Sequence, residues 1–198
     1  MKSLPLIYLC RHGQTDWNAS ARLQGQSDIP LNRQGVAQAQ RNGRYLANVL
    51  KSECAAFDFV SSPMRRAADT MRGIRREMGL ESEAFRTDER LKEIHFGDWQ
   101  GYTVPELHQR FPTEAARREA DKWNFLPPGT GAETYAGLAE RIAPVFRGLD
   151  RPSIVVAHGG VTRAFLNVFA GLSPVEASHL DIPQDRILRV RDGRIDWV

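Results

Sequence analysis

Two histidines and a pair of arginines follow apolar runs of the sequence, at points where buried strands should end. His12 lies in an Arg-His-Gly triplet at 11–13, His158 opens a His-Gly-Gly triplet at 158–160, and an Arg-Arg pair stands at 65–66. Guanidinium groups can hold the equatorial oxygens of a phosphoryl group while a neutral imidazole attacks phosphorus in line. Glycine after each histidine lets the backbone approach phosphate closely. These residue types therefore point to phosphoryl transfer.

Each feature by itself also has an ordinary structural explanation. A histidine at a strand end often hydrogen-bonds to the backbone, and an Arg-His-Gly triplet also occurs by chance. The arginine pair continues at helical spacing through Arg72, Arg75 and Arg76, which is typical of a solvated helix face. Joint placement favours a site, because open α/β sheets bind anions beyond the carboxyl ends of their strands, near helix N-termini.

The elements that position these residues are predicted from hydrophobic periodicity. Near-continuous apolar runs at 4–10, 57–60 and 153–157 are typical of strands buried on both faces. Apolar residues at helical spacing follow each run, and Asn32 is a plausible N-cap for the first helix. Ser62 is predicted to cap the second helix, with proline at its first position. Alternating strands and helices indicate an α/β fold.

Three further segments complete the predicted organisation. The polar stretch 102–128 is expected to be helical from a capping box at Thr103 onward and to end at the Pro-Pro-Gly of 127–129. A helical apolar stripe at 135–149 belongs to the core. Two short strands around an Asp-Gly turn predict a hairpin over 187–197 at an edge of the sheet.

Composition limits the class of protein. The chain has 198 residues, 41% hydrophobic and 26% charged, which suits one globular domain spanning 1–198. No apolar run is long enough to span a bilayer, and the first residues resemble a strand more than a signal peptide. Cys10 and Cys54 fit neither a redox pair nor a zinc framework, so we expect reduced thiols in the cytoplasm. The net charge of +3 suits small anionic substrates as well as a polyanion.

Five blocks of the chain, in order, carry a family resemblance. They are RHGQTDWN at 11–18, LQGQSDIPL at 23–31, SPMRRAADT at 62–70, LKEIHFGDWQG at 91–101 and AHGGVTR at 157–163. Together they resemble the histidine phosphatase superfamily, which includes cofactor-dependent phosphoglycerate mutases and many metabolite phosphatases. The resemblance implies a phosphoglycerate mutase-like fold of three layers, α/β/α, with a central and mostly parallel sheet. The segment 102–128 would be a small helical insert over the site.

The resemblance also implies roles for individual residues. His12 would be the nucleophile, and Arg11, Arg66 and His158 would complete a phosphate pocket. Matching the Arg-Ala-x-x-Thr motif places the binding role on Arg66 and leaves its neighbour at the rim. Glu93 matches the family's proton donor, which the chemistry needs because an alkoxide leaves poorly without protonation.

Outer contacts are expected from four further residues, and three histidines are left out. By the same matching, the substrate would touch Asn18, Gln24, Gly25 and Gly159. The remaining histidines, His95, His108 and His179, are expected to lie outside the catalytic set.

No metal ligand set stands at a suitable spacing in the sequence, so a metal-independent enzyme is expected. Arginine and imidazolium would neutralise charge in place of a metal. No cofactor is expected either, unless the protein is a mutase that uses 2,3-bisphosphoglycerate.

Three functions are compatible with these residues. The first is a phosphatase that hydrolyses a small phosphorylated metabolite through a phosphohistidine on His12 and has no nucleic-acid or membrane partner. The second is a cofactor-dependent phosphoglycerate mutase, although family mutases are generally longer between the residues matching Glu93 and His158. The third is a phosphoanion- or nucleic-acid-binding module without catalysis. The leaving group and the oligomeric state are left open by the sequence.

Overall fold

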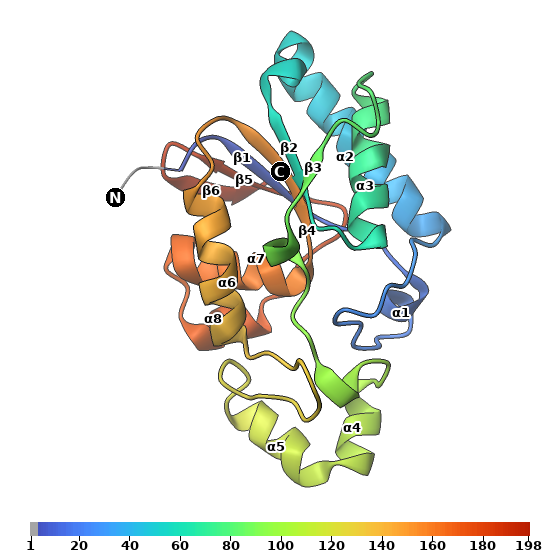
Figure 1. Cartoon of the computed structure of the whole chain (residues 1–198), viewed down its shortest axis with the longest axis vertical. Helices are drawn as coiled ribbons and strands as arrows, with labels where there is room; N and C mark the ends of the chain where they lie inside the picture. The colour runs from blue at the N-terminus through green and yellow to red at the C-terminus, as the bar shows by residue number, and fades with distance from the viewer. Residues whose placement is uncertain (1–3) are drawn as a thin grey trace.

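The structure, a computed structural model, describes residues 4–198 and is built around one six-stranded sheet. The strand order is β3-β2-β4-β1-β5-β6 (Figure 1). The strands are β1 (Ile7–Arg11), β2 (Asp58–Ser61), β3 (Arg86–Thr87), β4 (Ser153–Ala157), β5 (Ile187–Arg191) and β6 (Arg194–Trp197). The first four run parallel, and β5 pairs antiparallel with both β1 and β6. The expected mostly parallel sheet is therefore confirmed.

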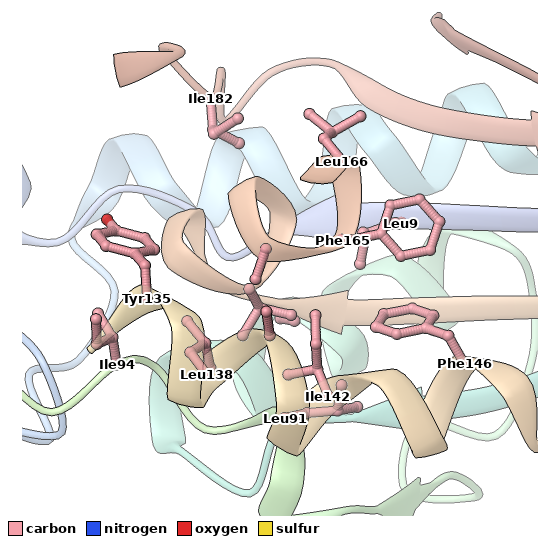
Figure 2. Packing of buried hydrophobic residues seen from close by; sticks show 14 of the residues in the cluster. Leu9, Leu91, Ile94, Tyr135, Leu138, Ile142, Phe146, Phe165, Leu166 and Ile182 are labelled. Atoms are coloured by element: carbon pink, nitrogen blue, oxygen red, sulfur yellow. The ribbon is translucent and has the colours of Figure 1, made fainter. Parts of the chain in front are cut away.

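Helices cover both faces of this sheet. One face carries α2 (Arg33–Leu50) and α3 (Arg65–Glu77), and the other carries α6 (Tyr135–Arg147), α7 (Gly159–Ala170) and α8 (Pro174–His179) (Figure 1). Side chains of β1 alternate between the two cores, as strand geometry requires: Tyr8 packs with the first layer and Leu9 with the second. Figure 2 shows Leu9 beside Phe146 of α6 and Phe165 of α7. The three-layer α/β/α arrangement is confirmed.

The register of the parallel strands brings three chain segments together. Arg11 at the end of β1 is opposite Ala157 at the end of β4, and Ser61 at the end of β2 is opposite Val156. Backbone hydrogen bonding continues one residue beyond β1 and β2, because His12 N donates to the carbonyl of Ala157 and Ser62 N donates to the carbonyl of Val156, both at 2.9 Å. The segments that follow β1, β2 and β4 therefore emerge side by side at one edge of the sheet.

Local capping explains where several helices begin. Asn32 caps α2 by accepting a 2.9 Å hydrogen bond from Gly35 N, as predicted. Thr103 and Glu106 form the predicted capping box at the start of α4 (Val104–Arg110). The hairpin is also confirmed: Asp192 and Gly193 both have positive φ, at 51° and 75°, as a type I′ turn demands.

The predicted cap at Ser62 is wrong. The N-cap of α3 is Met64, whose backbone is extended at φ −62° and ψ 136°, and the helix begins at Arg65. Because Met64 is extended, Pro63 cannot be the first helical residue, and the helix begins two residues after the predicted start. The hydroxyl of Ser62 lies instead 2.8 Å from His158 Nε2. A helix does follow Ser62 closely, as predicted, but Ser62 contacts His158 and does not cap that helix.

The insert 102–128 lies beyond the carboxyl ends of the strands, at the far end of the molecule in Figure 1. It contains α4 and α5 (Pro112–Ala120). The remaining short elements are α1 (Asp16–Ala19) and the 3-10 turns η1 (Lys51–Ala56), η2 (Glu89–Leu91) and η3 (Gly97–Trp99). Within residues 4–198, none of the helices combines the length and the apolar character needed to cross a bilayer.

Candidate active site

A small polar cavity of about 120 Å³ opens at the carboxyl ends of the parallel strands. We call it the phosphate pocket. Its lining residues come from the end of β1 and the segment that follows it, from the segment before η3, and from the N-terminal parts of α3, α6 and α7. They are Arg11, His12, Asn18, Arg22, Leu23, Gln24, Gly25, Arg66, Glu93, Phe96, Tyr135, Gly159 and Arg163. Larger hollows, of about 460, 400, 270 and 240 Å³, are lined by other residues, none of them histidine.

Hydrogen bonds fix the tautomer of His12. Its Nδ1 lies 2.7 Å from the carbonyl oxygen of Gly13, which can only accept, so Nδ1 carries the proton. Its Nε2 receives a 3.2 Å hydrogen bond from Arg66 Nε, which can only donate, so Nε2 has the free electron pair. Burial, followed by the charges of Arg66 and Arg11, lowers the pKa of His12 well below 6.5. The imidazole of His12 is therefore neutral, and its Nε2 is unprotonated.

Arg66 is fully buried and held in one orientation. Its two terminal nitrogens donate to the carbonyls of Ser27 and Gly25, each at 2.8 Å. Burial lowers its pKa to about 10, so the guanidinium remains charged at neutral pH. Its neighbour Arg65 behaves as expected of a rim residue, with a side chain 64% exposed and paired with Asp69.

Arg11 brings an unsatisfied donor to the pocket. One terminal nitrogen donates to the carbonyl of Ile182 at 2.5 Å, whereas the buried Nε has no hydrogen-bond partner among residues 4–198. Burial, followed by the charge of Arg163, lowers the pKa of Arg11. A buried N–H without a partner is costly, so this atom is a ready donor for an anion.

His158 lies beside His12, with the two ring centroids 5.1 Å apart. Its Nε2 is 2.8 Å from Ser62 Oγ, and its buried Nδ1 finds no partner in the described part of the chain. Burial, followed by the charge of Arg66, lowers the pKa of His158 well below 6.5. The second imidazole is therefore also neutral.

Glu93 reaches the pocket from the loop after η2. One carboxylate oxygen accepts from Ile94 N at 2.9 Å, and the other accepts from Gly160 N at 3.1 Å, in the first turn of α7. A side chain at position 160 would displace this carboxylate, because its Cβ would lie 2.3 Å from Glu93 Oε1. The structure thus places a carboxyl group on the pocket wall and holds it there by backbone N–H groups.

The predicted outer residues Asn18, Gln24, Gly25 and Gly159 all line the pocket. Asn18 Oδ1 accepts from Thr15 N, which leaves the side-chain amide hydrogens as its donors. The three excluded histidines lie elsewhere. His108, for example, is paired with Glu119 at 2.8 Å.

Several residues that contact the site were not assigned to it by sequence reasoning. Gln184 donates to the carbonyl of His12 and to Asn18 Oδ1, both at 3.1 Å, from a loop with no recognisable motif. Tyr135 and Arg163 line the pocket, and Arg163 Nη1 donates to Tyr135 Oη at 3.3 Å. Arg163 ends the last family block, so that signal was available. Tyr135 belongs to the helical stripe assigned to the core, although its ring was also considered as a possible wall of an apolar acceptor pocket.

Charge neutralisation in the pocket comes from guanidinium groups. No group of three or more His, Cys, Asp or Glu side chains that could hold a metal ion occurs in the part of the chain described, residues 4–198. Arg11, Arg66 and Arg163 instead surround a cavity that contains one carboxylate, Glu93. An anion bound there gains from these preorganised charges.

Comparison with known proteins identifies the class that this fold and pocket define. The chain belongs to the histidine phosphatase superfamily (branch 1), whose family model matches residues 7–197.

Individual relatives include both phosphatases and a mutase. The chain is 34% identical to a glucosyl-3-phosphoglycerate phosphatase of Mycolicibacterium vanbaalenii, over 86% of this chain and 76% of the relative. It is 30% identical to a 2,3-bisphosphoglycerate-dependent phosphoglycerate mutase of Beijerinckia indica, over 94% of this chain and 92% of the relative. Among solved structures, a mycobacterial glucosyl-3-phosphoglycerate phosphatase in complex with VO3 superposes with a TM-score of 0.78. Its sequence is 30% identical to this chain, and the superposition covers 98% of this chain and 96% of the solved one.

Proposed function

We propose that this protein is a metal-independent phosphatase that hydrolyses a small phosphorylated metabolite through a phosphohistidine on His12. The observation that supports it most is the fixed tautomer of His12, which directs an uncharged Nε2 into a pocket lined by guanidinium groups. Such a nucleophile needs no separate base to remove a proton before it attacks.

The reaction has two steps. In the first, Nε2 of His12 forms a bond to phosphorus while the bond to the leaving oxygen breaks, and Glu93 gives its proton to that oxygen. In the second, Glu93 takes a proton from water, and the hydroxide formed displaces His12 from phosphorus. Arg66 must exchange its hydrogen bond to Nε2 for one to a phosphoryl oxygen, and Arg11 Nε gains its first partner.

The substrate proposed here carries a second anionic group next to its phosphate. Arg163 lines the pocket, and two basic side chains of the insert, Arg118 and Lys122, are close enough to influence one another and Arg163. A phosphorylated glycerate carries a carboxylate on the same short carbon chain as the ester and has this charge pattern, and the relatives described above are named for such compounds. Lys122 and Arg163 also satisfy carbonyls of Ser178 and Leu180, which orients both cations.

The mutase alternative is kept because the Beijerinckia mutase matches this chain over almost its whole length. A mutase would return the phosphoryl group from His12 to a second hydroxyl and would need 2,3-bisphosphoglycerate to start. A binding module without catalysis is less favoured, because each residue expected of the catalytic set lies in or beside the pocket. We propose action in the cytoplasm, where the buried and free Cys10 and Cys54 would stay reduced.

The deciding experiment is a screen of phosphorylated metabolites with and without 2,3-bisphosphoglycerate. Phosphate release and isomer interconversion are recorded separately, and His12→Ala provides the background. We expect phosphate release without 2,3-bisphosphoglycerate. Isomerisation without phosphate release would overturn the proposal in favour of the mutase.

A second arm of the screen repeats the active reaction in a strong chelator. Guanidinium groups supply the charge in this pocket, so activity should persist in EDTA. Activity that is lost in EDTA and restored by magnesium would contradict a metal-independent mechanism.

A further inference from the structure

The environment of His158 contains a partner that the catalytic scheme does not use. Ser62 and His158 are both 0% exposed, and Ser62 Oγ lies 2.8 Å from His158 Nε2. The other ring nitrogen, Nδ1, is buried without a partner among residues 4–198. Nδ1 is therefore the atom of His158 that is free to meet a phosphoryl oxygen.

A neutral imidazole has only one N–H group, so its position decides what His158 can do. The groups around it favour the neutral form: Arg66, Arg11 and Arg141 are cations, and His12 is the neighbouring imidazole. Phosphoryl oxygens of a dianion only accept hydrogen bonds. His158 can bind them while neutral only if the proton is on Nδ1.

The hydrogen-bond partners of Ser62 indicate which way its hydroxyl points. Ser62 Oγ already accepts a long hydrogen bond, 3.4 Å, from the backbone N–H of Met64. Its own hydrogen is then free to point at His158 Nε2, because an oxygen that accepts from the backbone can still donate. In that arrangement Nε2 is the acceptor and the imidazole proton lies on Nδ1.

We propose that Ser62 is a positioning residue that sets the tautomer of His158, by donating its hydroxyl hydrogen to Nε2 and leaving the Nδ1 proton for the transferring phosphoryl group. This inference rests on the proposed phosphatase function for its catalytic consequence only. It gives the serine that follows β2 a specific role. Met64, whose extended backbone places the start of α3 at Arg65, donates its N–H to this hydroxyl at 3.4 Å.

The first test is the tautomer itself, read from the nitrogen chemical shifts of His158 in the wild-type protein by NMR. We expect a protonated Nδ1 and an unprotonated Nε2, with Ser62→Ala moving the proton toward Nε2. Ser62→Thr, which keeps a hydroxyl, should restore the wild-type tautomer. A wild-type His158 with its proton on Nε2 would overturn the proposal, even if Ser62→Ala does not fold.

The second test is kinetic and uses Ser61→Ala as the matched control. Ser61 is equally buried, but its hydroxyl donates to the carbonyl of Ser62 and does not contact His158. We expect Ser62→Ala to lower kcat about 10- to 100-fold, the range for one hydrogen bond to a charged group. Ser62→Thr should recover most of the loss.

The kinetic test also separates this role from proton donation. Alkyl phosphomonoesters and p-nitrophenyl phosphate should lose the same factor in Ser62→Ala, because phosphoryl oxygens are affected and the leaving group is not. Rates of Ser62→Ala within twofold of Ser61→Ala would overturn the proposal. A wild-type protein that hydrolyses no phosphomonoester would refute the phosphatase function instead, and the NMR result would still decide the tautomer.

Discussion

His12 and His158 are uncharged because of where they lie. Both are almost fully buried, at 2% and 0% exposure, and both face the guanidinium groups of Arg11 and Arg66. A proton added to either ring would be desolvated and repelled at once. The same cations that would hold a phosphate dianion thus keep His12 unprotonated before a substrate binds.

This burial makes stability depend on pH. The folded-state pKa of each histidine lies below the unfolded value of 6.5. Below pH 6.5 the unfolded chain therefore binds protons at these two histidines that the folded protein does not bind. The free energy of unfolding should fall on acidification, by up to about 1.4 kcal/mol per pH unit for each histidine. Urea unfolding at several pH values between about 8 and about 5 measures this change in the free energy of unfolding.

A variant without His12 tests whether this residue contributes to the pH dependence of stability. His12→Gln removes one of the two titrating rings, so its stability should fall less steeply with acid than that of the wild type. Equal slopes in the two proteins would show that burial of His12 is not the source. An NMR midpoint for His12 near 6.5 would do the same.

At the scale of elements, a clamp from α6 holds the loop that carries Glu93. Arg141 donates to the carbonyls of Arg90 and Lys92 at 2.6 and 3.0 Å and is paired with Glu133 at 2.7 Å. Glu133 in turn accepts from the backbone N–H of His95 at 3.1 Å. The Arg141–Glu133 pair therefore joins the helix to the backbone on both sides of Glu93.

Arg141→Lys should weaken proton donation selectively. Lysine cannot reproduce the fork of hydrogen bonds, so the Glu93 loop should lose its fixed position. We expect kcat on an alkyl phosphomonoester to fall about 10-fold or more, with a smaller loss on p-nitrophenyl phosphate, whose leaving group needs less help from an acid. Arg147→Lys, on the exposed side of the same helix, is the control. Equal losses on both substrates would count against the clamp.

Gly160→Ala tests the position of the Glu93 carboxylate through its contact with α7. The new Cβ would lie 2.3 Å from Glu93 Oε1, the end of a flexible side chain, so the carboxylate should move and the helix should remain. The alkyl ester should again lose about 10-fold or more in kcat while thermal stability changes little. Gly137→Ala meets nothing closer than 3.4 Å and serves as control. Unchanged turnover of the alkyl ester would refute this role of Gly160.

Sequence patterns predicted the elements better than their side-chain partners. The strands at 4–10, 57–60 and 153–157 and the cap at Asn32 follow from local periodicity and local hydrogen bonds, which a single sequence displays. The predicted role of Ser62 was wrong because its partner, His158, is 96 positions away and follows a different strand. Gln184 is 172 positions from His12, so nothing near it in the chain marks it as part of the site.

For the molecule as a whole, the three-layer fold concentrates positive charge at one end of the sheet. The pocket takes arginines from the loops and helices at the strand ends, and the insert adds Arg118 and Lys122 beside Arg163. Glu106 of the insert also pairs at 3.0 Å with Arg22, which lines the pocket. The insert therefore borders the pocket, where the leaving group of the substrate would lie.

This arrangement predicts a pH dependence of substrate binding. Burial, followed by the charges of Arg163 and Arg118, lowers the pKa of Lys122 to about 8. Lys122 is charged below that pH and neutral above it, so KM for a phosphorylated glycerate should rise as pH increases through about 8. Lys122→Met should raise KM about 10-fold at neutral pH, as loss of one charged contact would, and abolish this dependence. Lys51→Met is an exposed control.

KM values that are the same for Lys122→Met and the wild type across this range would exclude Lys122 from substrate binding. They would leave the reaction at His12 untouched, because the phosphate pocket does not include Lys122.

The most direct measurement of the central claim is to trap the phosphoenzyme. The protein is mixed with a radiolabelled phosphomonoester that it hydrolyses, quenched in alkali within one turnover, and digested. We predict label on the peptide that contains His12, stable in alkali and lost in acid, and no label in His12→Ala. Turnover of the ester with label on another residue, or with no labelled enzyme at any time, would contradict His12 as the nucleophile.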